Sequence, residues 1–244
     1  MVQARRARRR WAPILFLSGL LGLSALPGAA ALPDGVAADD PRAVARAVVA
    51  AALPPVTVPA WPDCREAPPV ALRLSGDVER GKMAGLKAGI AAAVAEGRCR
   101  LVLDLDSGGG RLPEAMNLAW FLRALPAGVE VTTRVGPGAR CHSACTLVFA
   151  AGRVRRAAAD ARFFFHPVSV SIRNPDLADL APGIAREMTR YWLEEIRSAD
   201  PNLARILGRF GAFRRDGRSV VLTAAATAAR GWPWVGQVEP APTS

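Results

Sequence analysis

Short apolar runs alternate with longer amphipathic segments along most of the chain, and this alternation constrains the fold more than any other feature. The strand-like runs are residues 70–76, 100–106, 129–135 and 162–166. The helix-like segments are residues 79–96, 112–125, 143–151 and 177–210, the last of them interrupted near Asp200-Pro201. A final strand–helix unit extends from Val220 to Gly231. Parallel strands need a long crossover connection, which is usually a helix. The pattern therefore predicts an α/β domain with a mostly parallel sheet, whose functional groups gather beyond the carboxyl ends of the strands.

The composition favours a folded domain and argues against a nucleic-acid-binding protein. Apolar residues make up 51% of the 244 residues, which is enough for a packed core. The formal charge is +11, but five arginines and no acidic residue lie within the first ten residues, so the rest of the chain carries +6. The other arginines often stand beside acidic residues, as in Arg186-Glu187. This arrangement is typical of a solvated surface, and no nucleic-acid partner is predicted.

The first 31 residues have the pattern of a secretion signal. A basic stretch precedes the apolar run from Trp11 to Leu26, and the small residues Ala29-Ala30-Ala31 follow. We expect a signal peptide over 1–31 with cleavage after Ala31, a Pro/Ala-rich linker over 32–69 and a globular domain over 70–238. The predicted location is periplasmic or secreted. A membrane attachment is expected only if this leader stays uncleaved.

Four cysteines form an even set in a chain that is expected to enter an oxidising compartment. Cys64 and Cys99 flank the first strand–helix unit and are predicted to form a disulfide. Cys141 and Cys145 are close enough in sequence to pair, although Cys145 could equally be a small buried apolar residue. Together with His142 and His166 these two cysteines have the residue types of a zinc site. Their spacing fits no standard zinc pattern, so no metal is predicted.

Ser143 and His166 are the candidate reactive pair. Ser143 follows a Gly-Pro-Gly loop at 136–138 and is predicted to open a short helix. Serine is favoured as a helix N-cap, which is a purely structural interpretation. A nucleophile would also suit this position, because the helix amino end, and the amide of Ala144 in particular, can face an oxyanion. His166, at a predicted strand end, is better placed than the adjacent His142 to accept the serine proton.

The glycine turn Ser107-Gly108-Gly109-Gly110 joins a predicted strand to a predicted helix. It could be a tight connection and nothing more. A phosphate cradle is disfavoured, because the Walker lysine and the Gly-x-Gly-x-x-Gly spacing are both missing. A third interpretation is an oxyanion hole, in which a glycine N–H faces the tetrahedral intermediate.

Taken in order, the three motifs resemble those of the Clp protease proteolytic subunit and its exported Clp-like relatives. The matching segments are 106–110 (Asp-Ser-Gly-Gly-Gly), 141–146 (Cys-His-Ser-Ala-Cys-Thr) and 164–167 (Phe-Phe-His-Pro), within a resemblance that covers about residues 70–236. The resemblance implies the Clp-protease/crotonase-like superhelix of repeated ββα units with a mostly parallel sheet. It also implies that Ser143 is the nucleophile and His166 the general base, with the amides of Gly110 or Gly109 and of Ala144 as the oxyanion hole.

The third catalytic residue is less well marked by this resemblance. The family's aspartate precedes its last strand–helix unit, and Asp216 is the matching candidate, in a loop that is not of the family's length. Asp176, Asp179 and Asp200 are alternatives. Gly108 stands where the family usually has proline, which we expect to be tolerated.

These features together predict an exported Clp-like serine peptidase without a cofactor, acting on a peptide or protein through an acyl-enzyme. Homo-oligomerisation is expected by analogy alone, because relatives of the resembled family often form rings. The alternative is a catalytically silent Clp-like module that binds a peptide or partner protein. An acyl-CoA enzyme of the crotonase type and a Ser–Lys dyad using Lys82 or Lys87 are two further, disfavoured hypotheses.

Overall fold

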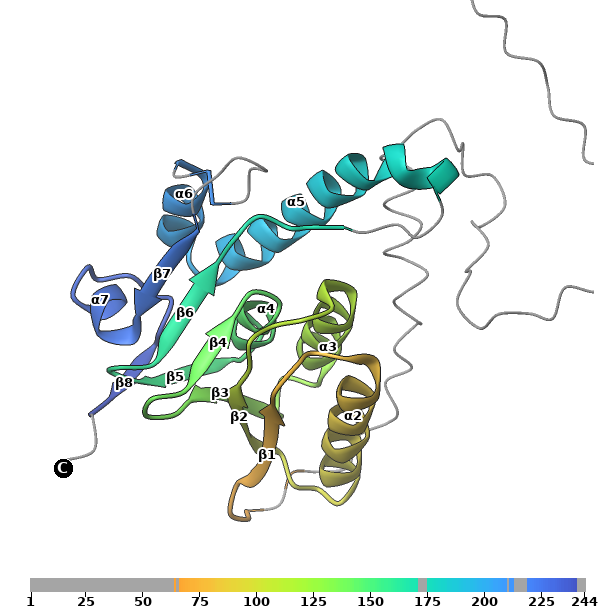
Figure 1. Cartoon of the computed structure of the whole chain (residues 1–244). Helices are drawn as coiled ribbons and strands as arrows, with labels where there is room; N and C mark the ends of the chain where they lie inside the picture. The colour runs from red at the N-terminus through yellow and green to blue at the C-terminus, as the bar shows by residue number, and fades with distance from the viewer. Residues whose placement is uncertain (1–63, 65, 171–174, 210, 213–218, 241–244) are drawn as a thin grey trace, which may run out of the picture. The chain divides into compact units, whose positions relative to one another are not determined.

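Five strands of the computed structural model form a parallel sheet, as the alternating pattern predicts (Figure 1). In spatial order they are β1 (Val70–Ser75), β2 (Arg100–Asp106), β3 (Glu130–Val135), β5 (Val154–Ala158) and β8 (Gln237–Glu239). Every neighbouring pair in this sheet is parallel. The structure describes residues 64, 66–170, 175–209, 211–212 and 219–240, and for 175–177 the backbone alone. The predicted signal peptide, nearly all of the predicted linker and Asp216 lie outside these residues.

The helices begin and end within a few residues of their predicted positions. They are α2 (Arg80–Ala95), α3 (Leu112–Ala124), α4 (Cys145–Ala150), α5 (Ala181–Ala199), α6 (Pro201–Arg209) and α7 (Ala224–Ala228), with a 3-10 helix η1 (Pro175–Leu180) before α5. Successive helices from α2 to α5 pack against one another (Figure 1). The predicted interruption near residue 200 is confirmed. Asp200 accepts a hydrogen bond from the Leu203 N–H at 2.9 Å and so caps α6, whose first residue is Pro201.

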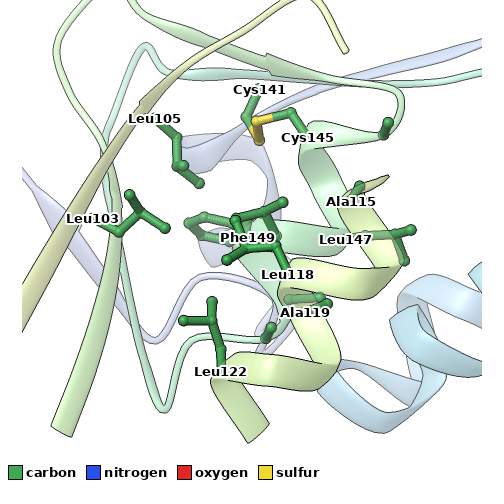
Figure 2. Packing of buried hydrophobic residues seen from close by; sticks show 14 of the residues in the cluster. Leu103, Leu105, Ala115, Leu118, Ala119, Leu122, Cys141, Cys145, Leu147 and Phe149 are labelled. Carbon is green, nitrogen blue, oxygen red and sulfur yellow. A yellow bond between two sulfur atoms is a disulfide. The ribbon is translucent and has the colours of Figure 1, made fainter. Parts of the chain in front are cut away.

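The core lies between the parallel sheet and this row of helices. Leu101, Leu103 and Leu105 alternate with more exposed residues along β2, so they face the same side of the sheet. Figure 2 shows Leu103 and Leu105 pointing toward Phe149 of α4. Burial of each such side chain contributes roughly 1.5–3 kcal/mol to folding.

A second, three-stranded sheet was not predicted. It contains β4 (Arg140–His142), β6 (Arg162–Phe165) and β7 (Val220–Thr223), with β4 and β6 parallel and β6 and β7 antiparallel. Ser107, just beyond β2, joins the two sheets: its N–H donates to the Arg140 carbonyl at 2.7 Å, and its carbonyl accepts from the His142 N–H at 3.0 Å. The carboxyl ends of β2, β4 and β6 therefore meet in one region.

All four cysteines are in disulfides, Cys64–Cys99 and Cys141–Cys145. The first confirms the predicted pair and ties the segment before β1 to the loop before β2. The second decides between the two interpretations of Cys145, and it also means that neither sulfur is a thiolate that could bind zinc. Two disulfides are characteristic of proteins in an oxidising compartment. Within the described ranges, no helix is long and apolar enough to cross a membrane.

Candidate active site

The structure brings together the three segments that the sequence singled out. The Ser143 N–H donates to the Phe164 carbonyl of β6 at 2.8 Å, which places the serine beside the strand that leads to His166. Ser143 and His166 line one pocket of about 490 Å³, together with Gly110. The rest of its wall comes from the start of α3, from residues 168–170 and from one face of α5. The pocket thus combines a serine, a histidine and the glycine turn with Arg111, Ser169 and a set of apolar residues.

Ser143 has an unusual backbone conformation. Its φ is +52°, and among the described residues it is the one non-glycine residue with a positive φ. Such a conformation costs a serine on the order of 1–3 kcal/mol and persists where surrounding contacts hold it. The purely structural interpretation of Ser143 as an N-cap is wrong: α4 begins at Cys145, its N-cap residue is Ala144, and no side chain caps it. The helix starts later because a left-handed residue cannot belong to a right-handed helix.

Contacts on both sides hold Ser143 in this conformation. Its N–H donates to the Phe164 carbonyl. Its own carbonyl accepts from the Thr146 N–H at 2.9 Å and from the Thr146 hydroxyl at 2.7 Å. The Cys141–Cys145 disulfide, visible in Figure 2, closes a five-residue loop around it, and both cysteines are fully buried. The serine is therefore held by its neighbours at a position where it lines the pocket.

His166 is oriented by a backbone carbonyl. Its Nδ1 lies 2.8 Å from the carbonyl oxygen of Pro167, which can only accept a hydrogen bond, so Nδ1 carries the proton. The other nitrogen, Nε2, is then unprotonated in the neutral ring and can accept a proton. The ring packs against Phe164 (5.3 Å between ring centroids) and meets Trp192 edge-on (6.2 Å). These contacts define both the tautomer and the position of the imidazole.

No carboxylate hydrogen-bonds His166 in the part of the chain that the structure describes. Asp216 and the side chain of Asp176 lie outside that part. Asp179 is exposed on η1, and Asp200 is buried and occupied with capping α6. Of the alternatives named from sequence, Asp200 thus has a structural role instead.

The glycine turn approaches Ser143 so closely that no side chain would fit. A Cβ on Gly109 would lie 2.6 Å from the Ser143 Cβ and 2.8 Å from the His142 carbonyl oxygen. The Gly109 N–H, one of the two predicted oxyanion donors of this turn, donates instead to the buried Ser107 hydroxyl at 3.1 Å. Among the described groups we find no acceptor for the N–H of Gly110 or of Ala144. Of the predicted donors, these two remain available for an oxyanion.

His142 is outside the pocket. It packs against Phe164 (5.4 Å between ring centroids), and its Nε2 is buried without a hydrogen-bond partner among the described residues. Burial lowers the pKa of His142 below its usual 6.5, and the positive charges of Arg140 and Arg162 lower it further. The neutral ring is therefore the form that the folded protein favours.

This lowered pKa predicts an acid-dependent loss of stability. The unfolded chain binds a proton at His142 near pH 6.5, whereas the folded protein resists it, so stability is full above about pH 6.5 and falls as the pH decreases from there toward the folded pKa. His142→Phe keeps the ring contact with Phe164 and removes the titrating group. Its Tm is expected to fall less than that of the wild type between about pH 7 and about pH 5. Equal decreases in the two proteins would contradict the lowered pKa.

The lysines do not take part in the site. Lys82 Nζ lies 3.2 Å from the Ser75 carbonyl and 3.2 Å from Glu79, and Lys87 Nζ donates to the Asn117 side chain at 2.5 Å. Neither lines the pocket of Ser143. This arrangement gives no support to a Ser–Lys dyad.

Several pocket residues were missed from sequence. Ile184, Met188 and Trp192 recur every four residues along α5 and line the pocket, so the helical period carried a signal for them. The carbonyl of Pro167 carried none, because every residue has one. Comparison of the sequence with protein-family models and with curated proteins found no match.

Proposed function

We propose that the protein is an exported serine hydrolase of the Clp-protease type that cleaves peptide or protein substrates through an acyl-enzyme at Ser143. The observation that carries the proposal is the pairing, in one pocket, of a serine held in a left-handed conformation with a histidine whose Nδ1 is occupied. Strained residues that are fixed by their surroundings cluster at active sites. An imidazole with a free Nε2 is the usual base for a serine nucleophile.

In the proposed mechanism, Ser143 Oγ attacks the carbonyl carbon of the substrate while His166 Nε2 takes the hydroxyl proton. The N–H groups of Gly110 and Ala144 donate to the oxyanion of the tetrahedral intermediate. His166 then gives the proton to the leaving amine, and the acyl group stays on Ser143. A water molecule, activated by the same imidazole, hydrolyses the acyl-enzyme and restores the serine. Because α4 has six residues, individual N–H groups and not a long helix dipole would supply most of the anion stabilisation.

The resemblance of the three ordered motifs to the Clp-protease/crotonase superfamily supports a superhelical fold of that type. The parallel sheet and its crossover helices agree with the proposal at the level of fold class. The two disulfides, together with the leader-like first 31 residues, support a periplasmic or secreted location.

One observation favours the alternative, a catalytically silent peptide-binding module. The partner of His166 Nδ1 is a neutral carbonyl, which orients the ring but stabilises the imidazolium less than a carboxylate does. If this alternative is correct, replacing Ser143 will leave the biological role of the protein unchanged.

A fluorophosphonate probe tests the proposal, because it reacts with serines that an adjacent base activates. The folded protein is expected to be labelled and the heat-unfolded protein is not. Ser169→Ala is the matched control, because Ser169 is the other serine that lines the pocket and is exposed. This variant is expected to label as the wild type does. No labelling of the folded wild type, or loss of labelling in Ser169→Ala, would contradict the proposal.

A further inference from the structure

A buried hydrogen-bond chain connects α5 to the backbone of Ser143. The indole Nε1–H of Trp192 donates to the Thr146 hydroxyl oxygen at 3.0 Å, and the Thr146 hydroxyl donates to the Ser143 carbonyl at 2.7 Å. The donor and the acceptor of each bond are fixed, because the indole N–H can only donate and the Ser143 carbonyl can only accept. Trp192 is 1% exposed and Thr146 is fully buried, so water does not compete for these bonds.

The peptide unit at the end of this chain is the one that carries a proposed oxyanion donor. The Ser143 carbonyl and the Ala144 N–H belong to the same planar peptide and point in opposite directions across it. Two bonds from Thr146, one from its N–H and one from its hydroxyl, fix the carbonyl and thereby fix the direction of the Ala144 N–H. The Ser143 φ of +52° makes this orientation one that the chain would not keep by itself.

Trp192 also touches the proposed base. Its ring meets that of His166 at 82°, with 6.2 Å between the centroids. The helix that carries it is anchored to α3, because Glu195 forms an ion pair with Arg123 and accepts a hydrogen bond from the Trp120 indole at 3.4 Å. Trp192 therefore contacts His166 directly and is connected to the Ser143 backbone through Thr146.

We propose that Thr146 and Trp192 are positioning residues, which hold the Ala144 N–H and the His166 ring in the geometry that the reaction needs. The inference rests on the proposed function. Neither residue takes part in a bond-making step. Thr146 is fully buried and does not line the pocket, so its loss is expected to change the rate of the chemical step and not the binding of a probe or substrate.

The first test uses Thr146→Val and Thr146→Ser in the full-length protein, with a fluorophosphonate as the probe. Valine has nearly the same shape but no hydroxyl, and serine keeps the hydroxyl. Thr146→Val loses both hydrogen bonds of the hydroxyl, the one that it accepts from Trp192 and the one that it donates to Ser143. The loss of the bond to the Ser143 carbonyl is expected to lower the maximal inactivation rate, kinact, about tenfold. The probe concentration that gives half of that rate is expected to stay the same. Thr146→Ser is expected to restore most of kinact.

The second test compares two buried tryptophans. Trp192→Phe removes the indole N–H at the site, whereas Trp234→Phe changes an equally buried ring that packs among Phe149, Phe163 and Phe165 and does not line the pocket. We expect Trp192→Phe to lower kinact more than Trp234→Phe does. This difference is expected even if the two substitutions lower Tm equally.

The outcomes separate this inference from the function on which it rests. A wild-type protein that labels, with Thr146→Val reacting at the wild-type rate, overturns the positioning role and leaves the proposed function intact. Decreases in Thr146→Val that Thr146→Ser shares equally also overturn it, because they show that the hydroxyl is not what matters. A wild-type protein that does not label contradicts the proposed function itself, and the positioning role with it.

Discussion

Replacing Ser143 or His166 with alanine is expected to lower the rate of ester or peptide hydrolysis by at least about 10³-fold, and replacing both is expected to lower it no further. The reason is that the two side chains act as one unit: the hydroxyl without a base is a weak nucleophile, and the base without the hydroxyl has no group to activate. Steady-state hydrolysis of an activated ester by the two single variants and the double variant is the measurement.

His142→Ala is the matched control for His166→Ala. Both histidines pack against Phe164, but His142 does not line the pocket. This control is expected to keep activity at neutral pH. If the double variant loses the product of the two single effects, Ser143 and His166 do not act as a unit. If Ser143→Ala keeps its activity, hydrolysis takes place elsewhere on the protein.

Replacing Gly109 with alanine is expected to abolish most activity, although the substitution removes no reacting group. The residue has a φ of +97°, which strains any L-residue with a side chain, and the new methyl group would meet the Ser143 Cβ at 2.6 Å. The same methyl group would lie 2.8 Å from the His142 carbonyl oxygen, so it cannot avoid Ser143 by shifting toward His142. Either the serine or the glycine turn must therefore move. A displacement of about 1 Å at a reacting centre can cost about 10²-fold in rate.

Gly108→Ala is the control for this prediction, since it adds the same methyl group one residue earlier. At Gly108 a Cβ would have one neighbour within 4 Å, the end of the Arg140 side chain at 3.9 Å. The measurement is the rate of ester hydrolysis by the two variants, with the Tm of each measured alongside. Equal activity of Gly109→Ala and Gly108→Ala would show that the close approach to Ser143 has no role in function.

Much of the fold could be predicted because its pattern is local. The alternating Leu101, Leu103 and Leu105 of β2 and the four-residue recurrence of Ile184, Met188 and Trp192 on α5 are repeats within single elements. Three short strands were missed for the complementary reason. β4 has three residues, β8 reads Gln-Val-Glu, and β5 carries Arg155 and Arg156 where an apolar alternation would be expected.

Arg155 shows what the sequence could not reveal about β5. Its guanidinium donates to the carbonyls of Trp234, at 2.9 Å, and of Pro233, at 2.8 Å, nearly 80 residues further along the chain. A partly buried arginine of this kind is compensated by tertiary contacts that no local pattern contains. Strand propensity alone therefore argued against a strand that the fold requires.

The candidate site was predictable in its residues and not in its geometry. Ser143 and His166 could be selected by type and by position after predicted elements, and the structure brings both to one pocket. The left-handed conformation of Ser143, the carbonyl of Pro167 at His166 and the Thr146–Trp192 bond depend on contacts between separate segments. The Ser107 hydroxyl, which occupies the Gly109 amide, likewise leaves no trace in the sequence.

Mass spectrometry of the acylated protein tests the central claim most directly. Trypsin cleaves after Arg140 and Arg153, and the peptide 141–153 between them contains a single serine, Ser143. Wild-type protein quenched during turnover of an activated ester is expected to carry the acyl group on this peptide, at Ser143, and to lose it as hydrolysis proceeds. An acyl group on another peptide, or hydrolysis without any acylation of residues 141–153, would contradict the account.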